Sequence, residues 1–193
     1  MTAGNHWTAV SPYVMWFLLG LPLVVVTYWY QSEAIYYGEY IKHTGRFSVW
    51  VLLLTMAVTP LRLMFPGQGW TRWLVQNRRY FGVAAFAYAV PHVLAYLMKK
   101  ETFALVAEEA AGPELWTGWL ALAIFLLLAV TSNNASVRWL GRSWRGLHRW
   151  IHVAALLTFA HWVLSAFDPL TACLHLAVLA ALEALRIWKS SAA

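Results

Sequence analysis

Histidine is the residue type with the clearest chemical potential in this sequence. His148, His152 and His161 fall within one segment, Leu140 to Asp168, that turns apolar for about one bilayer thickness after a cluster of arginines. Ionisable side chains inside a membrane-spanning helix are costly and usually mark a functional site. Imidazole is also a common axial ligand of haem iron. If the protein carries a redox cofactor, we therefore expect this helix to hold it.

A fourth histidine, His92, matches His161 in predicted depth. Each lies six residues before the same end of its apolar run, which is 80–98 for His92 and 148–167 for His161. At the helical rise per residue, both imidazoles should lie roughly 9 Å below the same membrane boundary. Two such histidines on different helices could ligate one haem from both faces. The alternative is that each one separately hydrogen-bonds a backbone group inside the bundle.

A second haem depends on His148, which precedes His161 by thirteen residues, or roughly 20 Å on a regular helix. The two side chains would point about 140° apart, and the residue thirteen positions before His92 is Arg79, which cannot ligate iron. A second haem would need another ligand, such as His152, or a single axial bond. The sequence thus predicts haem b held by His92 and His161, and leaves a second haem at His148 open.

The remaining candidate residues have weaker signals. Arg78 and Arg79 could pair with haem propionates or with a flavin phosphate, because guanidinium groups bind such anions well. His43 lies in the segment KHTGR, whose Thr-Gly pair suits a turn into a helix, so a cap is favoured over a ligand. His175 could touch a propionate, although a structural hydrogen bond is favoured.

Composition places the protein in a membrane. The 193 residues are 61% apolar and 11% charged, whereas ordinary globular chains are about 45–50% apolar and about 25% charged. The single Cys173 excludes an intrachain disulfide, and without a CxxC or CxxCH motif, iron–sulfur and c-type haem sites are excluded. The net charge of +6 does not indicate nucleic-acid binding, because most of the 13 tryptophans fall near the ends of apolar runs, as in an interfacial belt.

The histidines must therefore be positioned by transmembrane helices. We predict an all-α integral membrane protein, a single domain over 1–193 surrounded by membrane lipid, with six transmembrane helices of about 20 residues each. The predicted spans are about 12–30, 47–65, 80–98, 115–132, 148–167 and 170–188. Pro60 and Pro91 fall inside two of these spans. A kink at Pro91 could aim His92 inward, or it could be a routine feature of a membrane helix.

The basic residues are distributed unequally between the predicted loops. The first segment, the loops 66–79 and 133–147 and the C-terminal tail share one side of the membrane. That side has ten basic residues and the other side has four. Because positive loops stay in the cytoplasm, we predict that both termini are cytoplasmic. The ten are Arg62, Arg72, Arg78, Arg79, Arg138, Arg142, Arg145, Arg149, Arg186 and Lys189, and the four are Lys42, Arg46, Lys99 and Lys100.

Several of these segments together resemble a known family. IKHTGR near the second span, TPL at 59–61, a histidine late in the third span, and LGxxWxxLH at 140–148 followed by His161 resemble the MsrQ (YedZ) family. That family belongs to the ferric reductase-like transmembrane group, which includes the membrane domain of NADPH oxidases. The resemblance covers roughly residues 35 to 188, and its most specific part is LGxxWxxLH with a histidine thirteen residues later.

The resemblance implies a six-helix haem b protein of the bacterial inner membrane. It implies electron delivery to MsrP, a periplasmic molybdopterin enzyme that reduces methionine sulfoxide in oxidised proteins. The implied donor is the quinone pool or a cytosolic flavin reductase, with FMN as an additional cofactor. By matching positions, the resemblance makes His92, His148 and His161 haem ligands, whereas His152 has no such match.

These observations favour an electron-transfer subunit of an oxidoreductase system over a catalytic subunit. Two axial imidazoles would fill the coordination sphere of the iron, which suits electron transfer better than oxygen activation. About five residues follow the last span, so we expect electrons to enter from another molecule. Basic inner loops could dock the donor, and the acidic loop 101–114 could face a periplasmic acceptor. The alternatives are a cytochrome b or ferric reductase-like protein that serves another acceptor, and a haem-free scaffold or transporter.

Overall fold

The chain is all-α. The computed structural model describes residues 11–100, 102–165 and 169–191, and within them the backbone forms nine helices and no strand. The helices are α1 (Pro12–Gln31), α2 (Tyr37–Met64), α3 (Gly69–Lys99), α4 (Phe103–Glu109), α5 (Pro113–Val130), α6 (Asn134–Leu140), α7 (Arg142–His148), α8 (Ile151–Ser165) and α9 (Leu170–Ser191).

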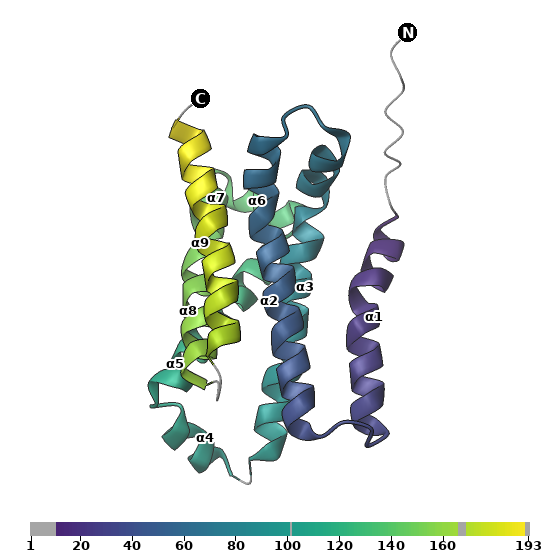
Figure 1. Cartoon of the computed structure of the whole chain (residues 1–193), viewed down its shortest axis with the longest axis vertical. Coiled ribbons are helices and arrows are strands. Elements are labelled where there is room, and N and C mark those ends of the chain that lie inside the picture. Colours follow the sequence, from purple (N-terminus) through teal and green to yellow (C-terminus); the bar gives the residue numbers. More distant parts are fainter. Residues whose placement is uncertain (1–10, 101, 166–168, 192–193) are drawn as a thin grey trace.

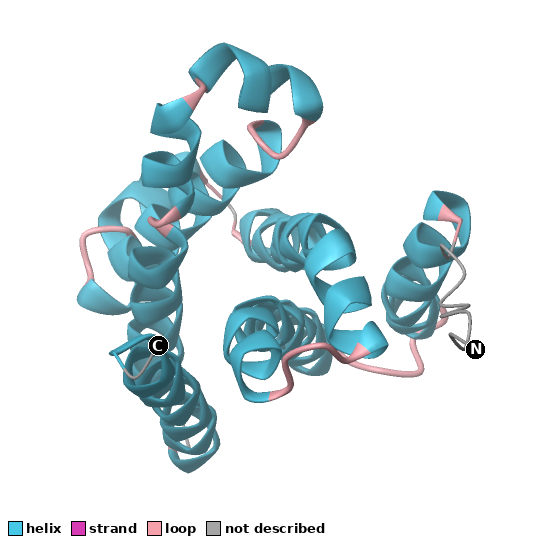
Figure 2. Ribbon diagram, turned by 90° about the horizontal axis from the view of Figure 1, so that it is seen from above, coloured by secondary structure: helices cyan, strands magenta, loops and turns pink. Residues whose placement is uncertain are grey.

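Six of the helices run side by side in alternating directions. These are α1, α2, α3, α5, α8 and α9, so that α1 begins and α9 ends at the same end of the bundle (Figure 1). The short helix α4 lies at the opposite end, which we call the α4 end. The most extensive contacts join α2 to α3 and α5 to α8, while α1 lies at the periphery (Figure 2). The bundle is thus built from two tightly packed helix pairs.

The structure agrees in part with the six predicted spans. Five helices, α1, α2, α3, α5 and α9, are long and apolar enough to cross a membrane, so the chain is a multi-pass membrane protein. The sixth predicted span corresponds to α8, which has only 15 described residues, fewer than the ~20 that a crossing usually takes. Residues 166–168, including the predicted turn at Asp168, lie outside the described part of the chain.

Two helices begin earlier than their apolar runs. α2 starts at Tyr37 instead of residue 47, and α3 starts at Gly69 instead of residue 80. The expected turn at the Thr-Gly pair of KHTGR is therefore wrong. Hydropathy detects only the apolar part of a helix. Polar turns can lengthen the helix beyond its apolar part when their backbone N–H groups find hydrogen-bond partners nearby. At the start of α2, the side chain of Glu39 accepts a hydrogen bond from the Tyr36 N–H at 3.1 Å and caps the helix.

The helix predicted from residue 148 onward is interrupted at its start. α7 ends at His148 and α8 begins at Ile151. Between them, the N–H groups of Arg149 and Trp150 donate to carbonyls three residues back, at 3.2 and 3.0 Å, so the regular α-helical pattern is broken. The side chain of His148 therefore cannot be placed by counting 100° per residue back from His161.

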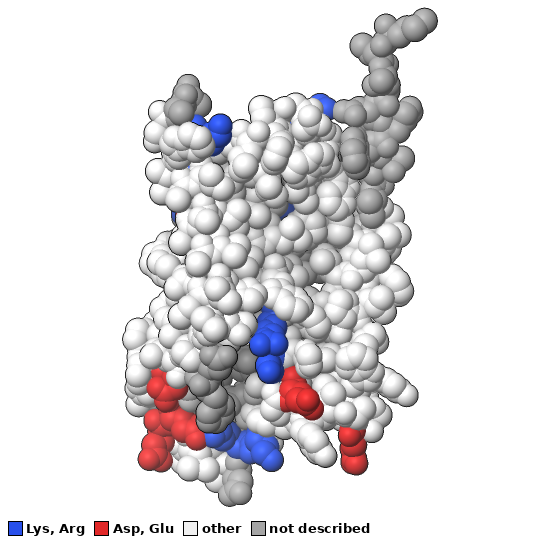
Figure 3. Space-filling view, in the orientation of Figure 1, with Lys and Arg blue, Asp and Glu red and all other residues white. Residues whose placement is uncertain are grey.

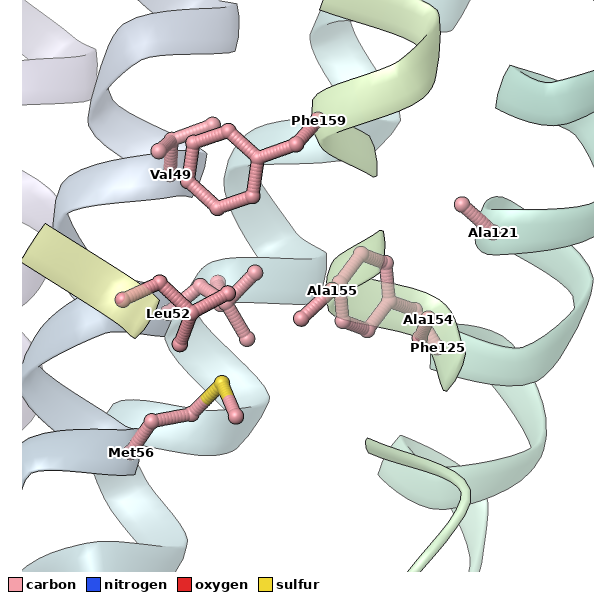
Figure 4. Close-up of a cluster of buried hydrophobic side chains, with 10 residues drawn as sticks. Val49, Leu52, Met56, Ala121, Phe125, Ala154, Ala155 and Phe159 are labelled. Atoms are coloured by element: carbon pink, nitrogen blue, oxygen red, sulfur yellow. The ribbon is translucent and has the colours of Figure 1, made fainter. Parts of the chain in front are cut away.

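The main hydrophobic core joins the two helix pairs. Small residues from α8 lie at its centre, because Ala154 and Ala155 are completely buried. In Figure 4, Leu52 and Met56 of α2 face these alanines. Small residues at helix interfaces let backbones approach closely, which is how membrane helices gain packing energy. This core thus contains side chains of both helix pairs.

Enlarging the core at its smallest residue should loosen the bundle. We expect Ala155→Leu to lower the stability in detergent by about 1–3 kcal/mol, because extra methylenes in a close-packed site force neighbours apart. Thermal unfolding followed by circular dichroism measures this. The matched control is Ala181→Leu on the exposed face of α9, and equal stability of the two variants would contradict the interpretation.

Candidate functional site

A mostly apolar cavity of about 560 Å³ lies between α2, α3, α5 and α8. This volume is in the range of roughly 300–1,000 Å³ that is typical of cofactor and ligand pockets. The lining residues come from the first turns of α2 and α5 and the last turns of α3 and α8, so the cavity lies toward the α4 end. Both His92 and His161 line it.

The two histidines face each other across the cavity. Their ring centroids are 6.2 Å apart and their planes are at 89°. Two imidazoles bound to opposite sides of one metal ion, through bonds of about 2 Å each, have centroids roughly 6 Å apart. The two histidines that were predicted to lie at equal depth are thus close together in the structure, and the separation of their rings suits a shared metal ion.

Hydrogen bonds fix the tautomer of both rings. Nδ1 of His92 lies 3.0 Å from the carbonyl oxygen of Ile41, and Nδ1 of His161 lies 2.6 Å from that of Glu114. A carbonyl can only accept, so each Nδ1 carries the proton and each Nε2 keeps a free lone pair. No atom of the described residues hydrogen-bonds either Nε2. This is the state in which imidazole binds a metal, with its other nitrogen held by a backbone group.

Two basic residues of α2 also line the cavity. Lys42 and Arg46 are one helical turn apart and share its wall with the histidines. Carboxylate groups on a bound molecule could pair with both, and Arg46 could do so through two parallel hydrogen bonds. An apolar cavity with two imidazoles and two cations fits haem b, which has an apolar ring, an iron that takes axial imidazoles and two propionates.

One ion-pair cluster links α4 to the end of α3 beside the cavity. Glu109 of α4 accepts hydrogen bonds from the Tyr96 hydroxyl, at 2.8 Å, and from the Lys100 ammonium. The hydrogen bonds from Lys100 and Tyr96 lower the pKa of the exposed Glu109 carboxyl below its ordinary value. Since Tyr96 also lines the cavity, this cluster connects α4 to its wall. Figure 3 shows that the carboxylates on the visible face gather at this end.

His148 lies outside the cavity. Its Nε2 is 3.1 Å from the Thr131 hydroxyl, and its ring stacks on Trp144 with centroids 4.0 Å apart. The Trp144 indole in turn donates to the Thr131 carbonyl at 2.9 Å. The structure thus places His148 in a polar contact between α5 and α7 and does not bring it to His92 and His161.

His152 belongs to a charged cluster with α9. Its Nε2 accepts from Arg186 at 3.0 Å, and its Nδ1 lies 3.4 Å from Glu183. Arg186 and Glu183 also pair with each other at 2.7 Å. These contacts link α8 to α9 and leave both ring nitrogens of His152 engaged.

The predicted arginine pair also lies away from the cavity. Arg78 donates to the Thr59 hydroxyl at 3.3 Å, and Arg79 donates to the side chain of Asn134 at 2.8 Å. Neither lines the cavity, whose basic lining residues are instead Lys42 and Arg46. Sequence reasoning missed this pair, although its spacing of four residues within IKHTGR was the available signal.

The two weaker histidine candidates have structural contacts. His175 accepts from the Trp50 indole at 3.0 Å and bonds the Thr171 carbonyl at 2.7 Å, which is the favoured structural role. His43 lies within α2 and its ring stacks near Phe47, with centroids 6.2 Å apart, so it caps no helix.

Comparison with known proteins places this chain in a family. Residues 44–159 match the family described as ferric reductase like transmembrane component. The chain is 35% identical, over 147 residues, to the protein-methionine-sulfoxide reductase heme-binding subunit MsrQ of Rhizobium meliloti (strain 1021), covering 67% of this chain and 66% of that protein. It is 34% identical over 154 residues to the MsrQ subunit of Ralstonia nicotianae (strain ATCC BAA-1114 / GMI1000), covering 76% of this chain and 69% of the relative.

The matched regions cover only part of the relatives and only some of the candidate histidines. The regions matched span about two thirds of the length of these curated relatives. The family match includes His92 and His148 and ends two residues before His161. Neither the described residues nor the names of the relatives support the expected FMN. With four helices around an apolar, two-histidine cavity and this degree of identity, the chain belongs to the MsrQ family of the ferric reductase-like transmembrane group.

Proposed function

We propose that this protein is a membrane electron-transfer subunit that holds one haem b between His92 and His161. The observation that carries the proposal is the facing pair of imidazoles, 6.2 Å apart, with each Nδ1 bonded to a backbone carbonyl. Haem supplies a one-electron couple between ferric and ferrous iron. The names of the relatives, which describe heme-binding subunits, support the same cofactor.

The protein's own groups determine how such a cofactor would be used. His92 and His161 would hold the cofactor from opposite walls, and a haem held by two imidazoles favours electron transfer over binding of oxygen. Lys42 and Arg46, which line the mostly apolar cavity, would hold the propionates by charge. The chain would therefore change the oxidation state of its cofactor without breaking a substrate bond, as expected of a subunit that serves a separate catalytic protein.

The proposed acceptor is a periplasmic methionine sulfoxide reductase of the MsrP kind, with this chain in the bacterial inner membrane. Support comes from the names of the relatives, which are subunits of a protein-methionine-sulfoxide reductase. The cavity lies toward the α4 end, which the charge distribution of the sequence assigns to the periplasmic side. A quinol or a cytosolic flavin reductase would supply electrons from the other side.

The haem assignment predicts the effect of removing either ligand. We expect His92→Ala and His161→Ala each to abolish the low-spin, bis-imidazole optical and EPR spectrum of the purified protein. His175→Ala should retain that spectrum, because both its ring nitrogens serve structural contacts. A full low-spin signal in both ligand variants would contradict the assignment, and a haem-free wild type would favour a scaffold.

Removing His148 tests the second ligand that the resemblance implies. Because the Nε2 of His148 contacts Thr131 and the ring lies outside the cavity, we expect His148→Ala to keep the low-spin spectrum and one haem per chain. Pyridine haemochrome analysis gives the stoichiometry. Two haems in the wild type and one in the variant would instead assign an inner haem to His148.

The cationic pair predicts weaker haem retention when its charge is removed. We expect Arg46→Gln and Lys42→Gln to lose haem faster to an excess of apomyoglobin than the wild type, because each would lose a charge-assisted pair with a propionate. Lys99→Gln, at the end of α3 and outside the cavity, is the matched control. Equal loss rates in all four proteins would show that the pair does not hold the cofactor.

Delivery to the acceptor can be measured with purified components. In proteoliposomes, the haem is first reduced by a quinol or by a flavin reductase, and the periplasmic reductase is then added with methionine sulfoxide. We expect haem reoxidation that requires both the partner and the sulfoxide. Reoxidation that is indifferent to the partner would show that this chain serves a different acceptor.

A further inference from the structure

A glycine lies directly behind each of the two cavity histidines. A Cβ at Gly45 of α2 would lie 3.2 Å from both Cε1 and Nδ1 of His92. A Cβ at Gly118 of α5 would lie 2.8 Å from Nδ1 of His161, closer than such atoms come in proteins. Any other residue would push the ring away from its present position, and more strongly at Gly118.

In both helices, the carbonyl that accepts the imidazole N–H belongs to the residue four positions before the glycine. Ile41 precedes Gly45 by four residues, and Glu114 precedes Gly118 by four residues. Their carbonyl oxygens accept the Nδ1–H groups of His92 and His161 respectively. Each imidazole thus lies against one turn of the facing helix, over the glycine and bonded to the carbonyl one turn earlier.

A buried threonine precedes each glycine and bonds the same carbonyl. The Thr44 hydroxyl is 2.9 Å from the Tyr40 carbonyl oxygen and 3.1 Å from that of Ile41. In α5, the Thr117 hydroxyl is 2.8 Å from the Pro113 carbonyl oxygen and 3.1 Å from that of Glu114. The same Thr-Gly pair, with the same bonds, therefore occurs on both sides of the cavity.

Routine membrane-helix features explain only part of this arrangement. Threonine often bonds a carbonyl four residues back, and small residues often occur at helix contacts. Gly82 and Thr55 show such routine cases. A Cβ at Gly82 would meet only a methyl of Thr55 at an ordinary 3.7 Å, and the Thr55 hydroxyl bonds only the Val51 carbonyl. Neither residue lines the cavity.

We propose that Thr44-Gly45 and Thr117-Gly118 are two matching cradles that position the axial imidazoles and set their strength as ligands. The inference rests on the proposed haem function. Glycine gives each ring room to reach the carbonyl, and the bond from Nδ1–H to that carbonyl makes the imidazole a more basic ligand. The single threonine hydroxyl proton is shared between this carbonyl and the nearer carbonyl one residue earlier, and this share weakens the bond from Nδ1–H. These four are positioning residues, since they act on the cofactor through the histidines.

Adding a methyl group to a cradle glycine tests the positioning role. We expect Gly118→Ala to displace the His161 ring and to shift or abolish the low-spin EPR signal, with a smaller change for Gly45→Ala because its contacts are longer. Gly82→Ala is the matched control and should keep the wild-type signal. Size-exclusion profiles and thermal unfolding of all three establish that the variants fold, and a wild-type EPR signal in folded Gly118→Ala would overturn the proposal.

Replacing the threonines tests the tuning role without adding bulk. In Thr44→Val and Thr117→Val, the carbonyl has one donor fewer and should bind Nδ1–H more strongly. A more basic imidazole stabilises ferric iron, so we expect a lower haem reduction potential with the low-spin spectrum retained. Thr55→Val is the matched control, because its hydroxyl bonds only the Val51 carbonyl. Potentials equal to that of the control, or higher than the wild type, would overturn the tuning role.

The outcomes separate this inference from the proposed function. If the wild-type protein binds no haem, or if both single histidine variants keep a full low-spin spectrum, the proposed haem site itself fails. If the histidine variants lose the spectrum while all the glycine and threonine variants match their controls, the haem site stands and the cradle proposal alone fails.

Discussion

The site depends on one constraint, which is that an imidazole N–H inside an apolar bundle must find an acceptor in the protein. Away from water, an unpaired polar group costs several kcal/mol, and here the backbone supplies the acceptor for both rings. A carbonyl inside a helix already accepts a hydrogen bond from its own helix and lies close to the helix surface. The imidazole must therefore approach the backbone very closely to donate a second hydrogen bond to the same oxygen. That approach requires the absence of a side chain at Gly45 and Gly118 and the close packing of α2 with α3 and of α5 with α8.

The rest of the bundle is arranged around these two helix pairs. The core between them includes the completely buried Ala154 and Ala155 of α8 together with Leu52 and Met56 of α2. The polar contacts of His148 and His152 lie elsewhere and connect α7 to α5 and α8 to α9. Charged and polar groups inside the membrane cost free energy. In this chain, His92 and His161 face a cavity, whereas His148 and His152 connect neighbouring helices.

Features that depend only on regular helical geometry could be predicted from the sequence. The depth of His92 and His161 could be counted along two helices, and the structure brings the rings together. The place of His148 could not be counted, because the regular α-helical pattern is broken at Arg149 and Trp150. The starts of α2 and α3 were missed because hydropathy does not detect the polar turns of a helix. Lys42 and Arg46 were assigned to a loop for the same reason, although they line the cavity.

The cradles show what a single sequence cannot reveal. A Thr-Gly pair is too short to be recognised as a motif. The number of residues between Gly45 and His92 also differs from the number between Gly118 and His161, so the sequence shows no repeat. Only the packing of helices shows that the two pairs have equivalent neighbours. The two sides nevertheless differ in how closely the ring approaches the facing helix. The ring of His161 is nearer to its carbonyl, at 2.6 Å against 3.0 Å for His92, and nearer to its glycine. Under the proposed function, the shorter bond to Nδ1–H would make His161 the more basic of the two proposed ligands.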